Sequence, residues 1–280
     1  MWLLALLPLR VLYFFADILY FFIYYVIWYR RRTVAENLRK SFPEKTRDDL
    51  KSIEKQYYHH LTYVIIEFVK IRHINREEIT KRMKIRNPEI LQELYSEGKC
   101  VFVALGHCGN WEWLGQKMAT IDGHKPFAIF KPLSNKFFDK HMRKLRARFH
   151  APNLIEFKKT YRTLMQNRHT VNAVIIAADQ TPTRGEINYW TVFLNQETPF
   201  FLGIEKMAKA LDYAVLYFDI RRERKGYYLI DIIPITKKPR ETKEYEITEK
   251  YVSLLEQTIR DEPYNWLWSH RRWKHKKVPN

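Results

Sequence analysis

The residues best suited to chemistry are His107 and Glu112, which lie in the octapeptide Gly-His-Cys-Gly-Asn-Trp-Glu-Trp at residues 106–113. An apolar run at 101–105 precedes the octapeptide and predicts a buried strand, and apolar residues at helical spacing follow it. We therefore expect His107 in a strand-to-helix turn and Glu112 in the first helical turn, where the two side chains can converge. Glu112 would then hold the His107 ring and leave its other nitrogen free to act as a general base.

The same pair also has a structural interpretation, with His107 as a satisfied histidine and Glu112 as an acid favoured at a helix N-terminus. The preceding strand, the two glycines and the flanking tryptophans favour a site. Cys108 is a weaker alternative, as a thiol nucleophile beside His107. Cys100 and Cys108 lie at opposite ends of the predicted strand, about 25 Å apart at roughly 3.3 Å per residue, so we expect no disulfide.

The elements that must position this turn alternate between strands and helices. Apolar runs predict strands at 84–86, 99–105, 127–130 and 171–178, and a hairpin at 215–220 and 227–233. Thr46-x-x-Asp49 is typical of a capping box and predicts the start of a long helix. Further helices are expected at 88–97, 161–167 and 243–260, and one capped by Ser134. The pattern predicts an α/β fold, with a mixed central sheet flanked by helices.

The N-terminal region, residues 1–29, is almost wholly apolar and is broken only by Arg10 and Asp17. Arg30-Arg31-Arg32 follows and would keep the C-terminal side in the cytoplasm. Three arrangements remain open for this segment: a membrane-spanning helix, a helix lying in the interface with Asp17 facing out, and a buried helix of a soluble protein. We divide the chain into a hydrophobic membrane anchor with its basic stop at 1–32 and a catalytic domain at 33–280.

The charge of the chain is strongly positive. Its 280 residues carry a formal net charge of +18, and 46% of them are apolar, which argues against global disorder. Residues 125–168 hold twelve Lys and Arg against two acids, and five more basic residues lie in 270–280. This balance predicts an anionic partner. The chain has no zinc pattern, RNA-binding signature or helix-turn-helix pattern, so we do not expect nucleic acid.

Two further groups of polar residues follow predicted strands. The first starts at Lys131, continues through Asn135 and Asp139, and is followed by Arg146 and Arg148, which suit a phosphate. The second is Asp179-Gln180, and Asp179 could pair with a basic site residue. Carboxyl ends of strands in open α/β sheets line ligand crevices. Each group also has a simpler interpretation. The first could be a solvated basic helix face, and the second could be a turn.

The octapeptide resembles the His-x-x-Asn-Trp-Glu signature of the lipid A biosynthesis late acyltransferases, within the glycerolipid acyltransferase superfamily. The segment from Lys131 resembles the second block of that family, although Lys131 stands where the family has arginine. The C-terminal Tyr-Asn-Trp-Leu-Trp-Ser-His-Arg-Arg-Trp-Lys, residues 264–274, is similar to the ending of the family. Tryptophans beside a cationic cluster suit a place near an anionic headgroup, and the alternative is a tail packed over the domain.

The resemblance implies a membrane-associated O-acyltransferase of the inner membrane, with its catalytic domain facing the cytoplasm. The donor would be an acyl thioester, with acyl carrier protein as the expected carrier and coenzyme A as the alternative. The acceptor would be a hydroxyl of an anionic lipid A precursor. No metal and no cofactor is expected. The residues expected to bind substrate are Gly109, Asn110, Lys131, Asn135, Asp139, Arg146, Arg148, Asp179, Gln180, His270, Arg271 and Arg272, and backbone N–H groups around Gly109 and Asn110 would stabilise the oxyanion.

Two other functions remain open on the sequence alone. One is acyl transfer to another acceptor, such as a lysophospholipid, glycolipid or aminolipid. The other is a basic membrane-surface protein without catalysis. They differ in their dependence on His107, because binding through charge would survive its loss and acyl transfer would not.

Overall fold

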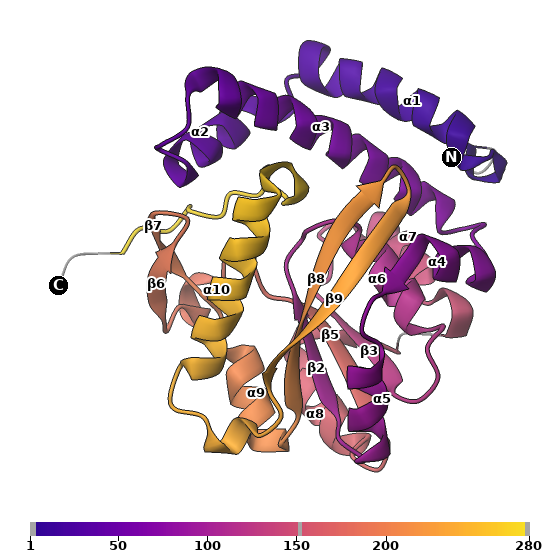
Figure 1. The fold of residues 1–280 in the computed structure, drawn as a ribbon, viewed down its shortest axis with the longest axis vertical. Helices are drawn as coiled ribbons and strands as arrows, with labels where there is room; N and C mark the ends of the chain where they lie inside the picture. The colour runs from indigo at the N-terminus through magenta and orange to yellow at the C-terminus, as the bar shows by residue number, and fades with distance from the viewer. Residues whose placement is uncertain (1–3, 151–152, 278–280) are drawn as a thin grey trace.

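The computed structural model describes residues 4–150 and 153–277, and a seven-stranded sheet lies at its centre (Figure 1). The strands run in the order β1-β9-β8-β2-β5-β3-β4. Their bounds are β1 Met83–Ile85, β2 Val101–Leu105, β3 Lys125–Phe130, β4 Asn153–Glu156, β5 Asn172–Ala177, β8 Ala214–Arg224 and β9 Tyr227–Thr236. Strands β8, β2, β5, β3 and β4 are parallel, and β9 is antiparallel to β8. The predicted mixed α/β sheet is confirmed.

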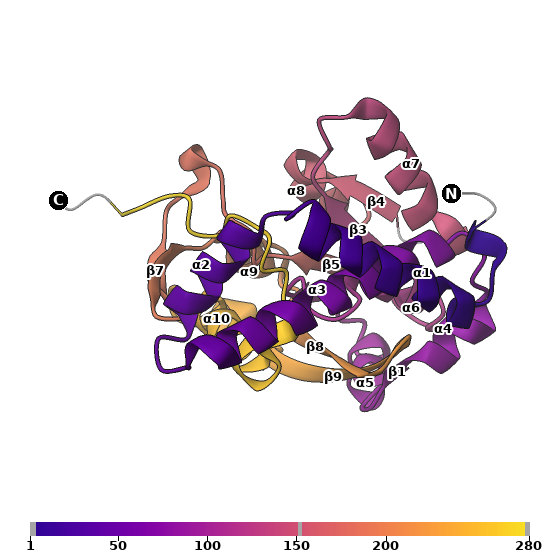
Figure 2. The same cartoon turned by 90° about the horizontal axis from the view of Figure 1, so that it is seen from above.

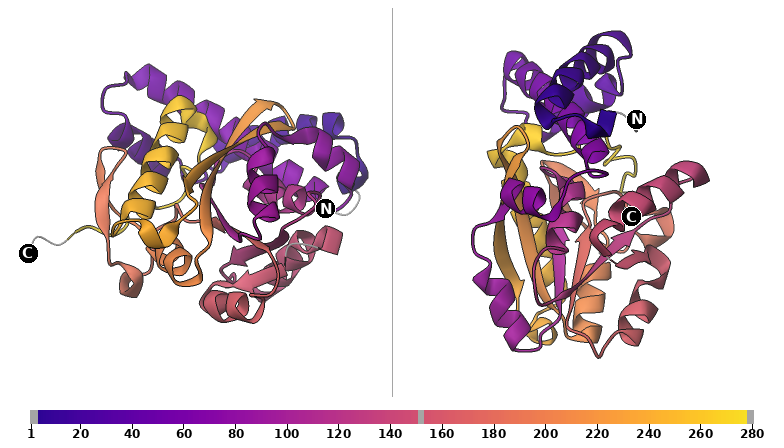
Figure 3. Two further views of the ribbon diagram at one scale, coloured as in Figure 1. Left: turned by 60° about the horizontal axis from the view of Figure 1, so that its bottom comes forward. Right: turned by 90° about the vertical axis from the view of Figure 1, so that its right-hand side faces the viewer.

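Helices cover both faces of the sheet, as Figures 1 and 3 show. They are α1 Leu9–Phe21, α2 Arg31–Ser41, α3 Arg47–Lys70, α4 Arg76–Arg82, α5 Glu89–Ser96, α6 Trp111–Met118, α7 Lys136–Arg146, α8 Thr160–Gln166, α9 Gly203–Leu211 and α10 Glu246–Asp261. Alternate residues of β2 enter two separate cores: Phe102 and Ala104 pack with residues of α9 and α10, whereas Val101 and Val103 pack with residues of α1, α5 and α6. This alternation follows the two-residue period of a strand.

The N-terminal helices form a layer across one end of the sheet (Figure 1). Helix α1 continues into a π-helical segment, η2 (Phe22–Val26), and Leu9–Val26 is the one described stretch long and apolar enough to cross a membrane. Figure 2 shows α1 lying beside α3. The residues buried on α1 are Leu9, Leu12, Tyr13, Ala16 and Tyr20. Residues 1–3 of the predicted anchor and 278–280 of the basic tail lie outside the described residues.

Local signals placed most of these elements correctly. The capping box at Thr46 and Asp49 is present, and α3 begins at Arg47. Helix α7 begins one residue later than predicted, because Asn135 rather than Ser134 caps it by accepting a hydrogen bond from the Phe138 N–H. The short strands β4, β6 (Trp190–Phe193) and β7 (Gln196–Pro199) were not predicted. Strand β4 has only two apolar residues in a row and β7 has none among its first three residues, so neither gives a clear apolar run.

The parallel strands bring their carboxyl ends to one edge of the sheet, below the N-terminal helix layer (Figure 1). Strand β2 leads to His107, β3 leads to Lys131, and β5 leads to Asp179 and Gln180. This edge is where open α/β sheets bind ligands. The fold therefore gathers three of the polar groups singled out in the sequence.

Candidate active site

The loop between β2 and α6 has a backbone that is fixed on several sides. Gly109 has a φ of +57°, and a Cβ at that position would lie 2.9 Å from the Ile220 carbonyl oxygen. The Gly109 N–H donates to the side-chain oxygen of Asn265 at 2.9 Å. Asn110 caps α6 by accepting from the Trp113 N–H at 2.9 Å and donates to the Glu67 carboxylate at 2.6 Å.

These contacts correct the expectation that Gly109 supplies an oxyanion donor. The Gly109 N–H already has a partner in Asn265, and the side chain of Asn110 is fully buried and serves as a helix cap. The Gly109 N–H and the Asn110 side chain therefore hold the shape of the loop, and the role expected for the Asn110 backbone N–H stays a prediction.

His107 is oriented by Asp179. Its Nδ1 lies 2.6 Å from Oδ1 of Asp179, and its backbone N–H donates to Oδ2 of the same carboxylate at 3.0 Å. The Trp266 indole N–H donates to that Oδ2 at 2.7 Å. The Asp179 side chain is only 2% exposed, so its two oxygens are held by named donors in a nearly dry environment. A carboxylate on Nδ1 favours the tautomer with its proton there and leaves Nε2 with its lone pair.

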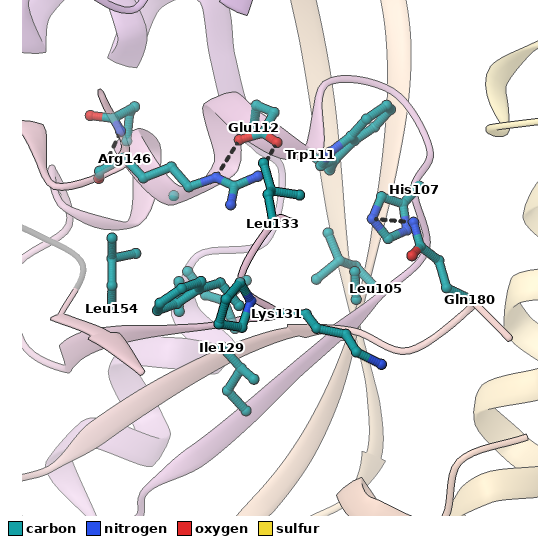
Figure 4. A pocket seen from close by; sticks show the side chains of 17 residues that line it. Leu105, His107, Trp111, Glu112, Ile129, Lys131, Leu133, Arg146, Leu154 and Gln180 are labelled. Carbon is teal, nitrogen blue, oxygen red and sulfur yellow. Dashed lines mark hydrogen bonds and ion pairs between the residues drawn. The ribbon is translucent and has the colours of Figure 1, made fainter. Parts of the chain in front are cut away.

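The other nitrogen of His107 faces Gln180. Nε2 of the ring lies 3.3 Å from the side-chain nitrogen of Gln180, as the dashed line in Figure 4 marks. With the proton on Nδ1, the Gln180 amide donates to Nε2. A hydroxyl that is to lose its proton to His107 must therefore displace this amide.

The electrostatics of the pair favour a charged ring. Burial lowers the pKa of His107, but the Asp179 carboxylate and its hydrogen bond outweigh it and raise the pKa above 6.5. Burial would raise the pKa of Asp179. The positive charge of His107 and the hydrogen bonds that His107 donates outweigh burial and hold this pKa well below its usual range. The arrangement stabilises an imidazolium, which is the form a general base takes after it accepts a proton.

Glu112 binds Arg146 rather than His107. The two side chains form a bidentate pair, with Nε and Nη2 of Arg146 at 2.9 and 2.5 Å from the two carboxylate oxygens. Helix α6 begins at Trp111, so Glu112 lies in its first turn and points toward α7, from which Arg146 comes (Figure 4). The expected hydrogen bond between Glu112 and His107 is replaced by this ion pair. Glu112 still acts on His107 through its charge, which raises the pKa of the ring.

A pocket of about 390 Å³ is lined by His107 and by the Glu112–Arg146 pair, and the buried Asp179 supports His107 from behind this lining. Its polar lining consists of His107, Glu112, Gln116, Lys131, Arg146 and Gln180. The other walls are mostly apolar and come from α6 and from β2, β3, β4 and β5, including Leu105, Ala128, Ile129, Leu154, Ile175 and Ala177. Figure 4 shows the His107 ring and the Arg146–Glu112 pair on different sides of the opening. The pocket thus joins the His107 imidazole, a fixed cation and an apolar floor.

Comparison with known proteins identifies the family. A family model described as bacterial lipid A biosynthesis acyltransferase matches residues 1–275. The chain belongs to this family. A search of curated proteins finds no match. Lipid A biosynthesis acyltransferases transfer acyl groups, so the chain is an acyltransferase and the resemblance noted in the octapeptide is confirmed.

The remaining predicted residues of the acyltransferase from the second block have local partners. Asn135 caps α7, and Asp139 accepts from the Leu133 N–H at 2.9 Å and pairs with Arg143. Arg148 donates to the Ile71 carbonyl. Of this block, Lys131 and Arg146 are among the described residues that line the pocket, whereas these three are not.

The C-terminal motif of the acyltransferase packs behind the site. Trp266 and Trp268 are buried, and His270 accepts from the Thr181 N–H at 3.2 Å. Arg272 is fully buried, donates to the Pro199 carbonyl at 2.7 Å and lies over the Phe200 ring. Burial lowers the pKa of Arg272 to about 10. Arg271 and Lys274 are exposed, so the motif supports the site with its buried residues and keeps two cations at the surface, where binding of an anionic headgroup stays a prediction.

Cys108 has no features of a nucleophile. Its side chain is buried, and burial with the nearby Asp179 charge raises the pKa of the thiol well above its usual range. A low thiolate fraction makes a cysteine inert. Both cysteines are free, as expected.

Sequence reasoning missed two supporting residues of the acyltransferase. Glu67 on α3 is fully buried and accepts from Tyr13, Tyr228 and Asn110. The sequence feature that could have indicated Glu67 is its place as a lone acid in the apolar run 64–69. Trp266 was noted only as part of a headgroup segment, although its indole is a partner of Asp179. That contact joins positions 87 apart in the chain, which spacing does not reveal.

Proposed function

We propose that this lipid A biosynthesis acyltransferase moves an acyl chain from acyl carrier protein to a hydroxyl of an anionic lipid A precursor, with His107 as the general base. The observation that carries the proposal is the His107–Asp179 pair, whose free nitrogen opens on a pocket with a fixed cation and apolar walls. Asp179 takes the positioning role that the motif spacing suggested for Glu112.

The reaction needs one proton carrier. Nε2 of His107 takes the proton of the acceptor hydroxyl as the oxygen attacks the thioester carbonyl, and Asp179 stabilises the resulting imidazolium. The tetrahedral intermediate then expels the thiolate, and the imidazolium returns the proton to sulfur. The products are an ester and a free thiol. The Gln180 amide, which occupies Nε2 in the absence of substrate, lies close enough to donate to the reacting oxygens once it is displaced.

Arg146 and Lys131 form the proposed anion subsite. Glu112 accepts hydrogen bonds from Nε and Nη2 of Arg146 and so fixes the plane of the guanidinium. The direction of Nη1 is fixed with it. Lys131 adds a second positive charge at the end of β3. Guanidinium groups bind phosphate with defined geometry, and ammonium groups bind it as point charges. A phosphorylated glycolipid fits this pair of cations.

The apolar floor of the pocket suits a hydrocarbon chain. Its walls come from neighbouring strands of the sheet, and Gly115 on α6 leaves room one turn after Glu112. Chains bound there would gain the usual ~0.8 kcal/mol for each buried methylene.

The test is acyl transfer from labelled acyl carrier protein to a tetraacylated lipid A precursor in detergent, with wild type beside His107→Ala. We expect product from the wild type alone. Product from both proteins would contradict His107 as the base. Product from wild type only with acyl-coenzyme A, or only on a lysophospholipid, would overturn the proposed donor or acceptor and leave the base in place.

A further inference from the structure

The outward side of α1 and η2 is a row of exposed apolar side chains, which we call the outer face. It consists of Val11, Phe14, Phe15, Ile18, Phe21, Phe22, Tyr25, Val26, Ile27 and Trp28. Soluble monomers rarely expose a contiguous apolar patch made of so many large side chains. We therefore expect the outer face to be covered by a membrane or by another protein surface.

The opposite side of α1 belongs to the core of the domain. Leu9, Leu12 and Ala16 are buried in the same cluster as Val101 and Val103 of β2, the strand that leads to His107. Figure 3 shows α1 resting on α3 at one end of the molecule. Removing α1 from this position would expose that cluster to water.

Polar contacts also tie α1 to α3 along its length. Lys70 donates to the Leu7 carbonyl at 2.9 Å, Tyr13 donates to Glu67 at 2.6 Å, and Tyr63 donates to Asp17 at 3.1 Å. If α1 crossed a bilayer in this position, α3 would enter the hydrocarbon with Glu67 and Lys70. If α1 crossed alone, those buried groups would lose their partners. Both outcomes are costly.

The length and charge of the segment suit a surface position. Leu9–Val26 is 18 residues, or about 27 Å of helix, which is slightly short of the ~30 Å hydrocarbon core. Arg10 lies near one end, and Arg30, Arg31 and Arg32 follow the other. Asp17, the sole acid in residues 1–35, is half-exposed and accepts from Tyr63, with the Lys225 ammonium 3.7 Å from its carboxylate. Cations around an apolar helix face complement an anionic bilayer.

We propose that the outer face docks into an anionic bilayer with α1 parallel to the membrane surface, at the boundary of headgroups and acyl chains, so that α1 does not cross the membrane. A groove of about 490 Å³ opens beside this face, between η2, α3 and the C-terminal segment. Its walls are mainly Ile23, Ile27, Leu61, Ile65 and Leu267, and His270 lies at its polar end. His270 contacts Thr181, the neighbour of Gln180, so the groove leads from the docked face toward the site.

The first test is topology, and it does not depend on catalysis. The full chain carries different epitope tags at its two ends in sealed inside-out vesicles of the inner membrane. Protease is added outside, where the cytoplasmic surface is exposed. We expect both tags to be digested, because both ends lie on one side. A protected N-terminal tag beside a digested C-terminal tag would show a spanning helix and overturn the proposal.

The second test is binding to vesicles of phosphatidylethanolamine and phosphatidylglycerol. The double variant Phe14→Glu, Phe21→Glu changes two exposed residues of the outer face, and Val192→Glu on β6 is the matched control at an exposed apolar residue elsewhere. We expect the double variant to lower the partition coefficient at least about tenfold and the control to leave it unchanged. Unchanged binding of the double variant would contradict the proposal.

A second copy of the chain is the alternative cover for the outer face. In that case the double variant would turn a dimer into a monomer and leave vesicle binding unaltered, which would also overturn membrane docking. Because neither test measures acyl transfer, a failure of the proposed reaction would remain distinguishable from a failure of this inference.

Discussion

The carboxylate of Asp179 lies 2.6 Å from Nδ1 of His107, whereas Glu112, the acid of the sequence motif, forms a bidentate pair with Arg146. The two acids therefore hold two different residues of one pocket lining. Asp179 favours one tautomer of His107 and stabilises its charged form, and Glu112 fixes the cation of Arg146. This division can be tested by comparing variants of the two residues.

Asp179→Asn should reduce kcat by roughly 10²–10⁴-fold, because an amide on Nδ1 no longer stabilises the imidazolium and can favour the wrong tautomer. The measurement is the steady-state rate of acyl transfer with saturating donor and acceptor. Circular dichroism of the variant serves as the folding control. A kcat within a few fold of wild type would show that Asp179 does not position the base.

The pH profile of kcat/KM should have an acid limb with a midpoint above 6.5. His107 acts as a base only when neutral, and Asp179 raises its pKa, so activity is lost as pH falls through that raised value. Asp179→Asn removes the charge and should move the limb to lower pH. An acid limb that stays in place in the variant would assign it to another group.

Glu112→Gln should act mainly on acceptor binding. Without the carboxylate, Arg146 loses its fixed orientation, and we expect KM for a phosphorylated acceptor to rise about tenfold, equivalent to about 1.4 kcal/mol. Arg146→Lys should raise KM for the phosphorylated acceptor in the same way, since lysine lacks the bidentate fork. An acceptor without phosphate is the control and should respond less. A large fall in kcat at constant KM would instead place Glu112 with His107 in the chemical step.

Gly109→Ala should destabilise the site loop. The φ of +57° costs an L-residue about 1–2 kcal/mol, and the added Cβ would lie 2.6 Å from the Ile220 side chain and 2.9 Å from its carbonyl oxygen. We expect a lower midpoint in urea unfolding and a loss of activity greater than the loss of stability explains. Gly185→Ala is the control, because its Cβ would meet nothing within 4 Å. Equal behaviour of the two variants would contradict this view of the loop.

Glu67→Ala should lower the free energy of unfolding by about 3 kcal/mol, since it leaves three buried donors without an acceptor. Tyr13→Phe removes one of these hydrogen bonds and should cost about 1 kcal/mol. Burial raises the pKa of Glu67, so the wild-type contribution is largest at low pH and declines as pH rises through that raised value. Urea titrations in detergent at several pH values measure both effects. A smaller loss for Glu67→Ala than for Tyr13→Phe would refute the shared role of the carboxylate.

Elements with strong local signals could be predicted from the sequence. The Thr46 capping box, the buried run of β2 and the hairpin of β8 and β9 each depend on residues close together in the chain. The position of His107 at the end of β2 followed from the same kind of signal. Strand β4 was missed because its sequence, Asn-Leu-Ile-Glu, contains only two apolar residues and so gives no clear apolar run.

The partners within the site were harder to predict because they join distant positions. Glu112 lies five positions after His107, which made it the apparent partner, but helix α6 turns it toward Arg146 on α7. Asp179 comes from another strand, and its contact with His107 depends on β2 pairing beside β5. The sequence suggested a basic partner for Asp179 without identifying which one. The order of strands in the sheet, with β5 beside β2, makes His107 the partner of Asp179.

The contacts of the C-terminal segment affect the order in which parts of the site can form during translation. Asn265 holds the backbone of Gly109, Trp266 holds Asp179, and Ser269 accepts from Arg30 near the N-terminal helix. These residues are translated long after α1 and the His107 loop. The nascent chain therefore presents α1 and the His107 loop before residues 265–269 are available to hold Gly109 and Asp179 in place.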